Sequence, residues 1–306
     1  MPFPTAIFLV MRLSRFGIAL MGSALLFSTS IVSVQSASAS VKVFPGARPF
    51  SVFVPSSYDS ALPAPLLIAL HGFSQSGDKF ESYLHLGPIA EKEGILYVHP
   101  DGTKDSRGNR FWNGTPECCN YQAPLVDDDS YIMNIIKQVS QKYSVDPARI
   151  YLVGHSNGGF MVNRMACRHA DTFAAVVNMA GGSYVKSSTC KPSGPISVLQ
   201  IWGTKDITYK VNHYGGRVIP GAVQTIATWA SLNRCLNQSI VNQHQLDLDR
   251  KVPGLETTVT MYLNCPATTS IEFWSITGAG HVPDISKSFS ADLVQFLLEH
   301  PKETSH

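Results

Sequence analysis

The run Leu66-Leu67-Ile68-Ala69-Leu70 is apolar at every position, and it constrains the fold more than any other segment. A strand without a polar face must be covered on both faces, as happens in the middle of a parallel sheet. Further strands are expected at 95–98, 149–153, 173–179 and 196–202, with helical patterns between most of them. This alternation predicts an α/β fold with a mostly parallel central sheet and helices on both faces.

The other elements follow from apolar spacing and turn residues. We expect edge strands at 41–44 and 50–54, a strand pair within 239–263 and a strand at 271–276. Helices are expected at 79–92 with a break near Gly87-Pro88, from Asp127 to a stop at Asp146-Pro147, from the turn at Ser156 to about Arg168, at 222–233 and at 286–300. The connection from Met179 to Ile196 is too short for a helical lid, so no large lid is expected.

The first 39 residues have the pattern of an export signal. Arg12 and Arg15 precede the apolar stretch 16–27, and the small residues 36–40 permit cleavage after Ala39. The apolar stretch is too short for a membrane anchor. We therefore expect a signal peptide at 1–39, a catalytic domain at 40–306, and a secreted protein, extracellular or periplasmic, that leaves the membrane on cleavage. Met11 is an alternative start.

Charge gives no sign of a nucleic-acid partner. The chain of 306 residues has a formal net charge of +2, and Arg12 and Arg15 are the only charged residues before Ser40, so the remainder balances to zero. Neither nucleic acid nor an anionic membrane is expected as a partner. With 44% hydrophobic and 15% charged residues, the chain is long enough for a substantial core.

Six cysteines agree with an oxidising compartment and a disulfide framework. They do not read as metal ligands, because no C-x-x-C occurs and Cys118 and Cys119 are adjacent. We expect no metal and no cofactor. The favoured pairs are Cys235 with Cys265 and, less strongly, Cys167 with Cys190. This leaves either a vicinal pair or two free thiols at 118 and 119.

The segment Gly154-His155-Ser156-Asn157-Gly158 has the pattern of a nucleophile elbow, in which a strand turns sharply into a helix and exposes a serine hydroxyl. A serine needs a positioned imidazole to take its proton and a carboxylate to orient that imidazole. On this fold the order should be serine, acid, histidine. Asp206, just beyond a buried strand, and His281, in a glycine-rich loop beyond the last strand, meet that order. Asp284 is a rival acid, ranked lower because it lies only three residues from His281.

Acyl transfer also requires two N–H groups that face the oxyanion, together worth roughly 3 kcal/mol or more. The expected donors are the backbone N–H groups of Phe73, in the turn after the first buried strand, and of Asn157. His71 precedes this turn. We expect it to support the oxyanion loop and to border the substrate rather than to act as the base.

A set of motifs resembles secreted esterases of the polyhydroxybutyrate depolymerase and feruloyl esterase group. The resemblance covers residues from about 48 to 298 and rests on 70–77, 111–114, 118–119, 126–128, 154–159, 202–206 and 280–281. It implies an α/β-hydrolase fold, Ser156 as nucleophile, Asp206 as acid, His281 as base, and oxyanion donors at Phe73 and Asn157. One departure is Val282 after the histidine, where an aromatic residue is frequent in the group, so one apolar wall of the acyl pocket is expected to differ. Because no linker or polymer-binding module is seen, soluble or partly soluble esters are expected rather than crystalline polymer.

The expected substrates are feruloyl-type, hydroxyalkanoate or short acyl esters, such as plant cell-wall feruloyl esters or polyester oligomers. The long loop 101–126, with Phe111, Trp112 and Tyr121, is the expected aromatic wall, although Trp112 would equally suit packing of the loop onto the domain. Trp202, Tyr209 and Tyr214 are candidates for the opposite wall, again with packing as the alternative.

Two other functions stay open. A serine peptidase on the same fold would cleave amides, and an inactive binding or adhesion protein would carry the scaffold without chemistry, although none of the three expected catalytic residues is lost. Asn113 and Asn237 lie in glycosylation sequons, which matter only if the host glycosylates secreted proteins.

Overall fold

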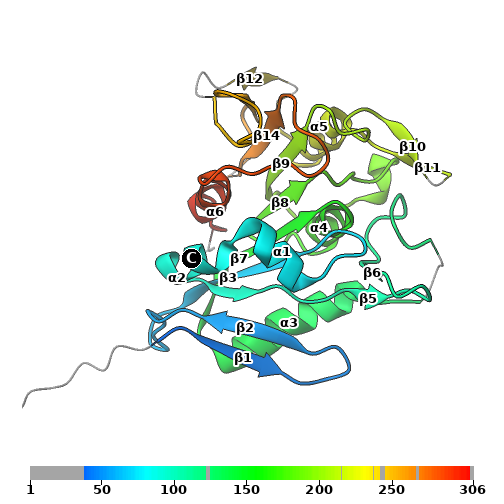
Figure 1. The fold of residues 1–306 in the computed structure, drawn as a ribbon. Helices are drawn as coiled ribbons and strands as arrows, with labels where there is room; N and C mark the ends of the chain where they lie inside the picture. The colour runs from blue at the N-terminus through cyan, green and yellow to red at the C-terminus, as the bar shows by residue number, and fades with distance from the viewer. Residues whose placement is uncertain are drawn as a thin grey trace, which may run out of the picture. The chain divides into compact units, whose positions relative to one another are not determined.

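The chain folds around one large sheet with the strand order β1-β2-β4-β3-β7-β8-β9-β14-β13-β12 (Figure 1). The computed structural model describes residues 38–121, 125–214, 216–236, 238–241, 245–266 and 269–303. Residues 1–37 of the expected signal peptide, and Asn237 of the second sequon, lie outside these residues. The strands are β1 Ser40–Phe44, β2 Phe50–Val54, β3 Ala64–Leu70, β4 Leu96–Val98, β7 Val145–His155, β8 Ala175–Met179, β9 Ser197–Gly203, β12 Ser239–Val241, β13 Thr257–Tyr262 and β14 Ile271–Ile276.

The middle of the sheet is parallel, as predicted. Strands β4, β3, β7, β8, β9 and β14 pair in parallel. Antiparallel pairs, β1 with β2 and β2 with β4, complete one edge, and β14 with β13 and β13 with β12 complete the other. The expected edge strands and the strand pair within 239–263 are thereby confirmed.

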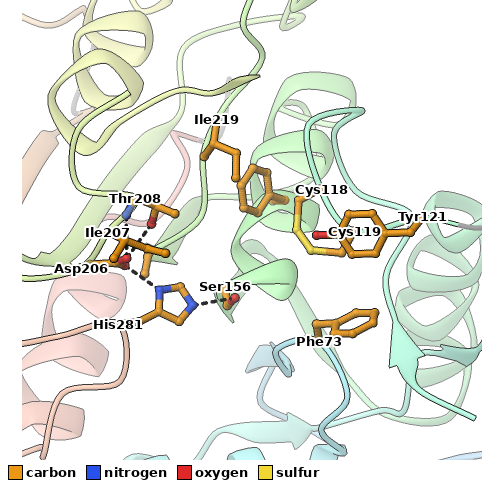
Figure 2. Close-up of a pocket in the computed structure, with 12 residues that line it drawn as sticks. Phe73, Cys118, Cys119, Tyr121, Ser156, Asp206, Ile207, Thr208, Ile219 and His281 are labelled. Carbon is orange, nitrogen blue, oxygen red and sulfur yellow. Dashed lines mark hydrogen bonds and ion pairs between the residues drawn. A yellow bond between two sulfur atoms is a disulfide. The ribbon is translucent and has the colours of Figure 1, made fainter. Parts of the chain in front are cut away.

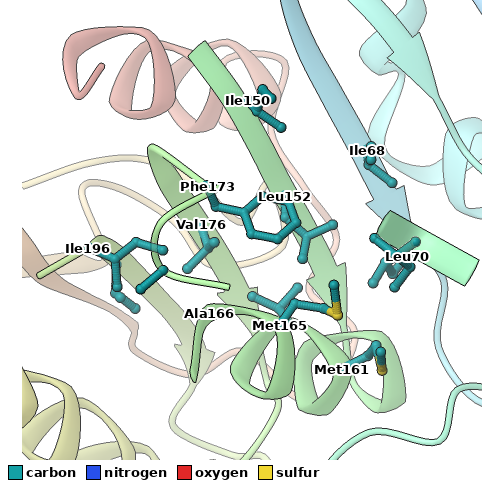
Figure 3. Packing of buried hydrophobic residues seen from close by; sticks show 14 of the residues in the cluster. Ile68, Leu70, Ile150, Leu152, Met161, Met165, Ala166, Phe173, Val176 and Ile196 are labelled. Atoms are coloured by element: carbon teal, nitrogen blue, oxygen red, sulfur yellow. The ribbon is translucent and has the colours of Figure 1, made fainter. Parts of the chain in front are cut away.

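Helices cover both faces and give three layers. Helices α1 Gly77–Leu84, α2 Leu86–Glu93 and α6 Phe289–Glu299 pack on one face, and α3 Asp128–Lys142, α4 Asn157–Arg168 and α5 Ala222–Leu232 on the other. Strand β3 shows why both faces are needed: Leu66, Ile68 and Leu70 join the core beneath α3, α4 and α5, whereas Leu67 and Ala69 join the core beneath α1, α2 and α6. Figure 3 shows the first core, with Met161 and Met165 of α4 against Leu152 and Leu70.

Two expected helix boundaries differ in position from the structure. The expected break within 79–92 is confirmed, but it lies at His85, which adopts a left-handed conformation with φ 51°, rather than at Gly87-Pro88. Pro88 is tolerated because it lies in the first turn of α2, where a backbone N–H has no intrahelical partner. Helix α3 ends at Lys142, and Asp146-Pro147 belong to β7 rather than stopping the helix.

Short elements lie in the loops that follow the carboxyl ends of the parallel strands. Two hairpins, β5 Thr103–Lys104 with β6 Arg110–Phe111 and β10 Asn212–Tyr214 with β11 Arg217–Ile219, were not predicted. The connection after β8 holds only the 3-10 helix η1 Ser187–Thr189, so the expectation of no helical lid there is confirmed. No helix among the described residues is both long and apolar enough to cross a membrane.

All six cysteines lie in the described part of the chain and are paired. The predicted pairs Cys235–Cys265 and Cys167–Cys190 are confirmed. Cys118 and Cys119 form a vicinal disulfide, so the alternative of two free thiols was wrong.

Candidate active site

The elbow folds as its glycines require. Ser156 lies between β7 and α4 with φ 54° and ψ −117°, a backbone conformation that is unfavourable for a residue with a side chain. A Cβ atom on Gly154 would lie 2.4 Å from the carbonyl oxygen of Gly158, and one on Gly158 would lie 2.1 Å from the carbonyl oxygen of Leu70. Only glycine fits at either position, so the turn can close and hold the Ser156 hydroxyl forward.

Three side chains that are distant in sequence form one hydrogen-bonded chain (Figure 2). His281 Nε2 lies 2.8 Å from Ser156 Oγ, and His281 Nδ1 lies 2.6 Å from Asp206 Oδ2. They follow β7, β9 and β14, whose carboxyl ends share one edge of the sheet. The predicted order of serine, acid and histidine therefore brings the three groups together.

Asp206 is buried and fully engaged. Its Oδ2 also accepts a hydrogen bond from Trp202 Nε1 at 2.8 Å, and its Oδ1 accepts from the backbone N and the hydroxyl of Thr208, both at 2.8 Å. Burial alone would raise the pKa of Asp206, but the hydrogen bond and charge of His281, with the Thr208 hydrogen bonds, lower it overall. The carboxylate therefore stays charged and holds Nδ1 of His281.

The rival acid Asp284 points elsewhere. Its carboxylate forms ion pairs with Arg250 and Lys251, the latter at 2.9 Å. In the described structure Asp206, not Asp284, accepts from His281.

His71 orients the expected oxyanion loop from behind. Its Nδ1 donates to the carbonyl of Gly72 at 2.7 Å, and its Nε2 accepts from the backbone N of Gly102 at 2.9 Å. Burial lowers the pKa of His71, which agrees with this neutral form. In a trans peptide the N–H points opposite to the C=O, so this bond turns the Phe73 N–H away from His71. Asn157 is the first residue of α4, where the N–H has no partner within the helix.

The side chain of Asn157 has a role that the sequence did not reveal. Its Oδ1 accepts from the backbone N of Trp112 at 2.7 Å, and its Nδ2 donates to the Trp112 carbonyl at 2.9 Å. The Trp112 indole donates in turn to the His71 carbonyl at 3.1 Å. One asparagine thus fastens the long loop after β4 to the start of α4.

Three predicted substrate contacts were wrong. His71, Trp112 and Trp202 are at most 1% exposed and lie behind the pocket wall, so the packing alternative holds for both tryptophans. Their polar atoms hold backbone groups or Asp206 instead. The side chain of Tyr214 lies outside the described residues.

A pocket with a volume of about 330 Å³ opens over Ser156. Tyr121 contributes to its wall, as expected of the long loop. Sequence reasoning missed most of the other walls, although the adjacent cysteines in the aromatic loop were a usable signal. The pocket is lined by Phe73, Cys118, Cys119, Tyr121, Ser156, Phe160, Ala180, Asp206, Ile207, Thr208, Ile219 and His281.

His155 ties the His281 loop to the elbow. Its ring Nε2 donates to the carbonyl of His281 at 2.8 Å, and the two rings lie 5.1 Å apart. Burial, with the neighbouring charge of His281, lowers the pKa of His155 to about 4. The ring is therefore neutral at pH 7, with its proton on Nε2, from which it donates to the His281 carbonyl.

Two further expectations concern metal binding and the Asn113 sequon. The described residues hold no group of three or more His, Cys, Asp or Glu side chains that could bind a metal ion. Asn113 is engaged on both sides, since its Nδ2 donates to the Val126 carbonyl and its Oδ1 accepts from Asn120.

Comparison with known proteins agrees with the predicted resemblance. Residues 49–197 match the family described as esterase PHB depolymerase. Feruloyl esterase B of Piromyces equi is 30% identical over 261 residues, which covers 82% of this chain and 46% of the relative. Poly(3-hydroxyalkanoate) depolymerase C of Paucimonas lemoignei is 26% identical, covering 86% of this chain and 67% of that protein. The chain thus spans about half to two thirds of the length of these relatives.

Solved structures show the fold. An acetyl xylan esterase from Aspergillus awamori superimposes with a TM-score of 0.61 at 16% identity, covering 85% of this chain and 99% of that chain. The feruloyl esterase module from Clostridium thermocellum gives a TM-score of 0.54 at 14% identity, covering 88% and 90%. The predicted α/β-hydrolase fold is confirmed.

Proposed function

Because residues 49–197 match the esterase PHB depolymerase family, we propose that this chain is a secreted serine hydrolase of carboxylic esters that works through an acyl-enzyme. The observation that carries the proposal is the hydrogen-bonded chain from Ser156 through His281 to Asp206, which ends in an open pocket.

The geometry supports a two-step acyl transfer. Ser156 Oγ attacks the ester carbonyl carbon while His281 Nε2 takes the hydroxyl proton, and Asp206 stabilises the imidazolium that forms. The N–H groups of Phe73 and Asn157 hold the negative oxygen of the tetrahedral intermediate. Its collapse breaks the bond to the alcohol oxygen, which receives the proton from His281. Water then attacks the acyl-enzyme with His281 again as base, which releases the acid and restores Ser156.

Feruloyl-type, hydroxyalkanoate and short acyl esters are the proposed substrates. Support comes from the names of the relatives, which include a feruloyl esterase and a poly(3-hydroxyalkanoate) depolymerase, and from the apolar walls of the pocket. Plant cell-wall feruloyl esters and polyester oligomers both carry such groups.

Secretion is proposed on two grounds. The segment 1–39 has the pattern of a signal, and three disulfides suit an oxidising compartment. Mass spectrometry of protein collected from the medium or periplasm should give a chain that begins at Ser40. A chain that retains residues 1–39 would contradict this part of the proposal.

The central experiment joins covalent labelling with kinetics. A fluorophosphonate should modify Ser156, located by peptide mass spectrometry, and Ser156→Ala should lose both labelling and hydrolysis of 4-nitrophenyl acetate. The matched control is Ser60→Ala, at an exposed turn, which should keep both. A Ser156→Ala protein that keeps most of its activity would overturn the proposal, and comparison with the 4-nitroanilide would show whether amides are cleaved instead.

A further inference from the structure

The vicinal disulfide Cys118–Cys119 forms part of the pocket wall itself. Both cysteines are 6% exposed and pack in one apolar cluster with Phe160 of α4 and Ile219 of β11, and Phe73 packs against that cluster. The other two disulfides do not line this pocket.

The position of the disulfide relative to Ser156 identifies the half of the ester that it faces. His281 must deliver a proton to the leaving oxygen, so the alcohol half lies on the side of His281, where Ile207 also stands. Cys118, Cys119 and Tyr121 lie across Ser156 from His281 (Figure 2). The disulfide therefore faces the acyl half.

The segment that carries the disulfide is held from both ends. The Arg217 guanidinium donates to the carbonyls of Pro116 at 2.8 Å and Asn120 at 3.1 Å, which flank the two cysteines. The Glu117 carboxylate accepts from the backbone N of Val185 at 2.9 Å. A wall fixed in this way cannot reshape itself around any ligand, so it discriminates between acyl groups by their shape. It also binds without the entropic cost of ordering the segment.

The chemistry of the wall favours a flat, polarizable group. Sulfur is polarizable and makes favourable contacts with aromatic rings. Phe73 and Tyr121 add aromatic surface, with their rings 5.9 Å apart in an edge arrangement. Phe160 and Ile219, which pack in the same cluster as the disulfide, add apolar surface beside it.

We propose that the Cys118–Cys119 disulfide is the specificity element for the acyl group, and that its sulfur surface receives an aromatic acyl group of the hydroxycinnamoyl class. This inference rests on the proposed ester hydrolysis. It assigns to the disulfide a role in selecting substrates, separate from any role in stability.

The test compares two esters with the same leaving group, 4-nitrophenyl ferulate and 4-nitrophenyl acetate. In Cys118→Ser/Cys119→Ser the ratio of kcat/KM for ferulate to that for acetate should fall by about tenfold. The matched control is Cys235→Ser/Cys265→Ser, which removes a disulfide outside the pocket and should keep the wild-type ratio even if the melting temperature drops. An unchanged ratio in the Cys118/Cys119 variant would overturn the inference.

A second pair of variants keeps the test decisive if the double serine variant folds poorly. Ile219→Ala, beside the disulfide, should lower the ferulate-to-acetate ratio, whereas Ile207→Ala, on the side of His281, should keep that ratio and change the preference among alcohols. The reverse pattern would place the acyl group on the other side and overturn the inference. A wild-type protein without labelling of Ser156 or hydrolysis of either ester would overturn the proposed function as well, whereas acetate hydrolysis with an unchanged ratio overturns the inference alone.

Discussion

Replacement of Asp206 by alanine tests the proposed site most directly, because this carboxylate accepts four hydrogen bonds. Two of its donors are His281 Nδ1 at 2.6 Å and Trp202 Nε1 at 2.8 Å, and the other two belong to Thr208. Without the carboxylate, His281 loses both the group that fixes its orientation and the charge that stabilises its protonated form. Loss of the acid of a catalytic triad lowers kcat by about 10⁴-fold, or 5–6 kcal/mol.

The same change has a smaller effect on stability. The Trp202 indole is 1% exposed, so its N–H would be left without an acceptor, which costs about 1–3 kcal/mol. The backbone N–H and the hydroxyl of Thr208 are only partly buried and can donate to water instead. We therefore expect the free energy of unfolding to fall by about 1–3 kcal/mol, far less than the change in activation free energy.

Kinetics of 4-nitrophenyl acetate hydrolysis and urea unfolding would measure the two effects separately. Asp284→Ala is the matched control: it removes the rival carboxylate, whose partners are Arg250 and Lys251, and should change kcat by less than about threefold. An Asp206→Ala protein that keeps more than a tenth of the wild-type kcat would refute the assignment, and so would a 10⁴-fold loss in Asp284→Ala.

Three further changes follow from individual contacts. Gly158→Ala places a Cβ atom 2.1 Å from the Leu70 carbonyl oxygen. It should lower the free energy of unfolding, measured by urea titration, by about 1–3 kcal/mol or more. The control Gly194→Ala meets no atom within 4 Å and should leave that free energy unchanged. His71→Ala frees the Gly72 carbonyl and should lower kcat by up to about 10²-fold, with little change in KM for small esters. The control is the exposed His213→Ala. Equal kcat values for the two variants would contradict the role of His71 in orienting the Phe73 N–H. The pKa of His155 is about 4 in the folded protein and about 6.5 when unfolded, so the unfolded state binds the extra proton between these values, and stability falls as pH falls. Between pH 7 and pH 4 the wild-type free energy of unfolding, measured with urea, should fall by about 3 kcal/mol through this group, and that of His155→Gln should fall less. An equal fall in both proteins would count against a buried neutral His155.

The mostly parallel sheet and the elbow were predictable because both leave a pattern in short stretches of the sequence. A short run without polar residues, such as Leu66–Leu70, favours a strand covered on both faces, and this run lies in β3. The glycines at 154 and 158 are needed by a close approach of backbone atoms. The break at His85 was not predictable in the same way, because a left-handed residue other than glycine leaves no clear pattern in the sequence.

The pocket walls were the least predictable part of the site. Trp112 and Trp202 were candidates for contact with substrate, with packing as the alternative, and each organises polar neighbours inside the protein. For Trp112 the reason is long-range, because Arg48, from before β2, lies 5.6 Å from its ring and also pairs with Asp128 at the start of α3. No pattern in the sequence near residue 112 indicates that Arg48 will lie against this ring. For Trp202 the partner, Asp206, is close in sequence. Ile219 reaches the pocket from the hairpin of β10 and β11, which was not predicted.

The sheet topology also explains why different features of the fold position the two hydrogen-bonded pairs of the candidate triad. Strands β9 and β14 are direct neighbours, with Trp202 opposite Ser275 and Gly203 opposite Ile276, so the loops that carry Asp206 and His281 leave the sheet side by side. Ser156 follows β7, which is separated from β9 by β8. The Ser156–His281 contact therefore depends on how far the loop after β14 reaches back across the sheet edge. His155, immediately before the nucleophile, binds the backbone carbonyl of His281 and fixes that reach. The second position of the elbow thus serves the base, in the same turn that presents the serine.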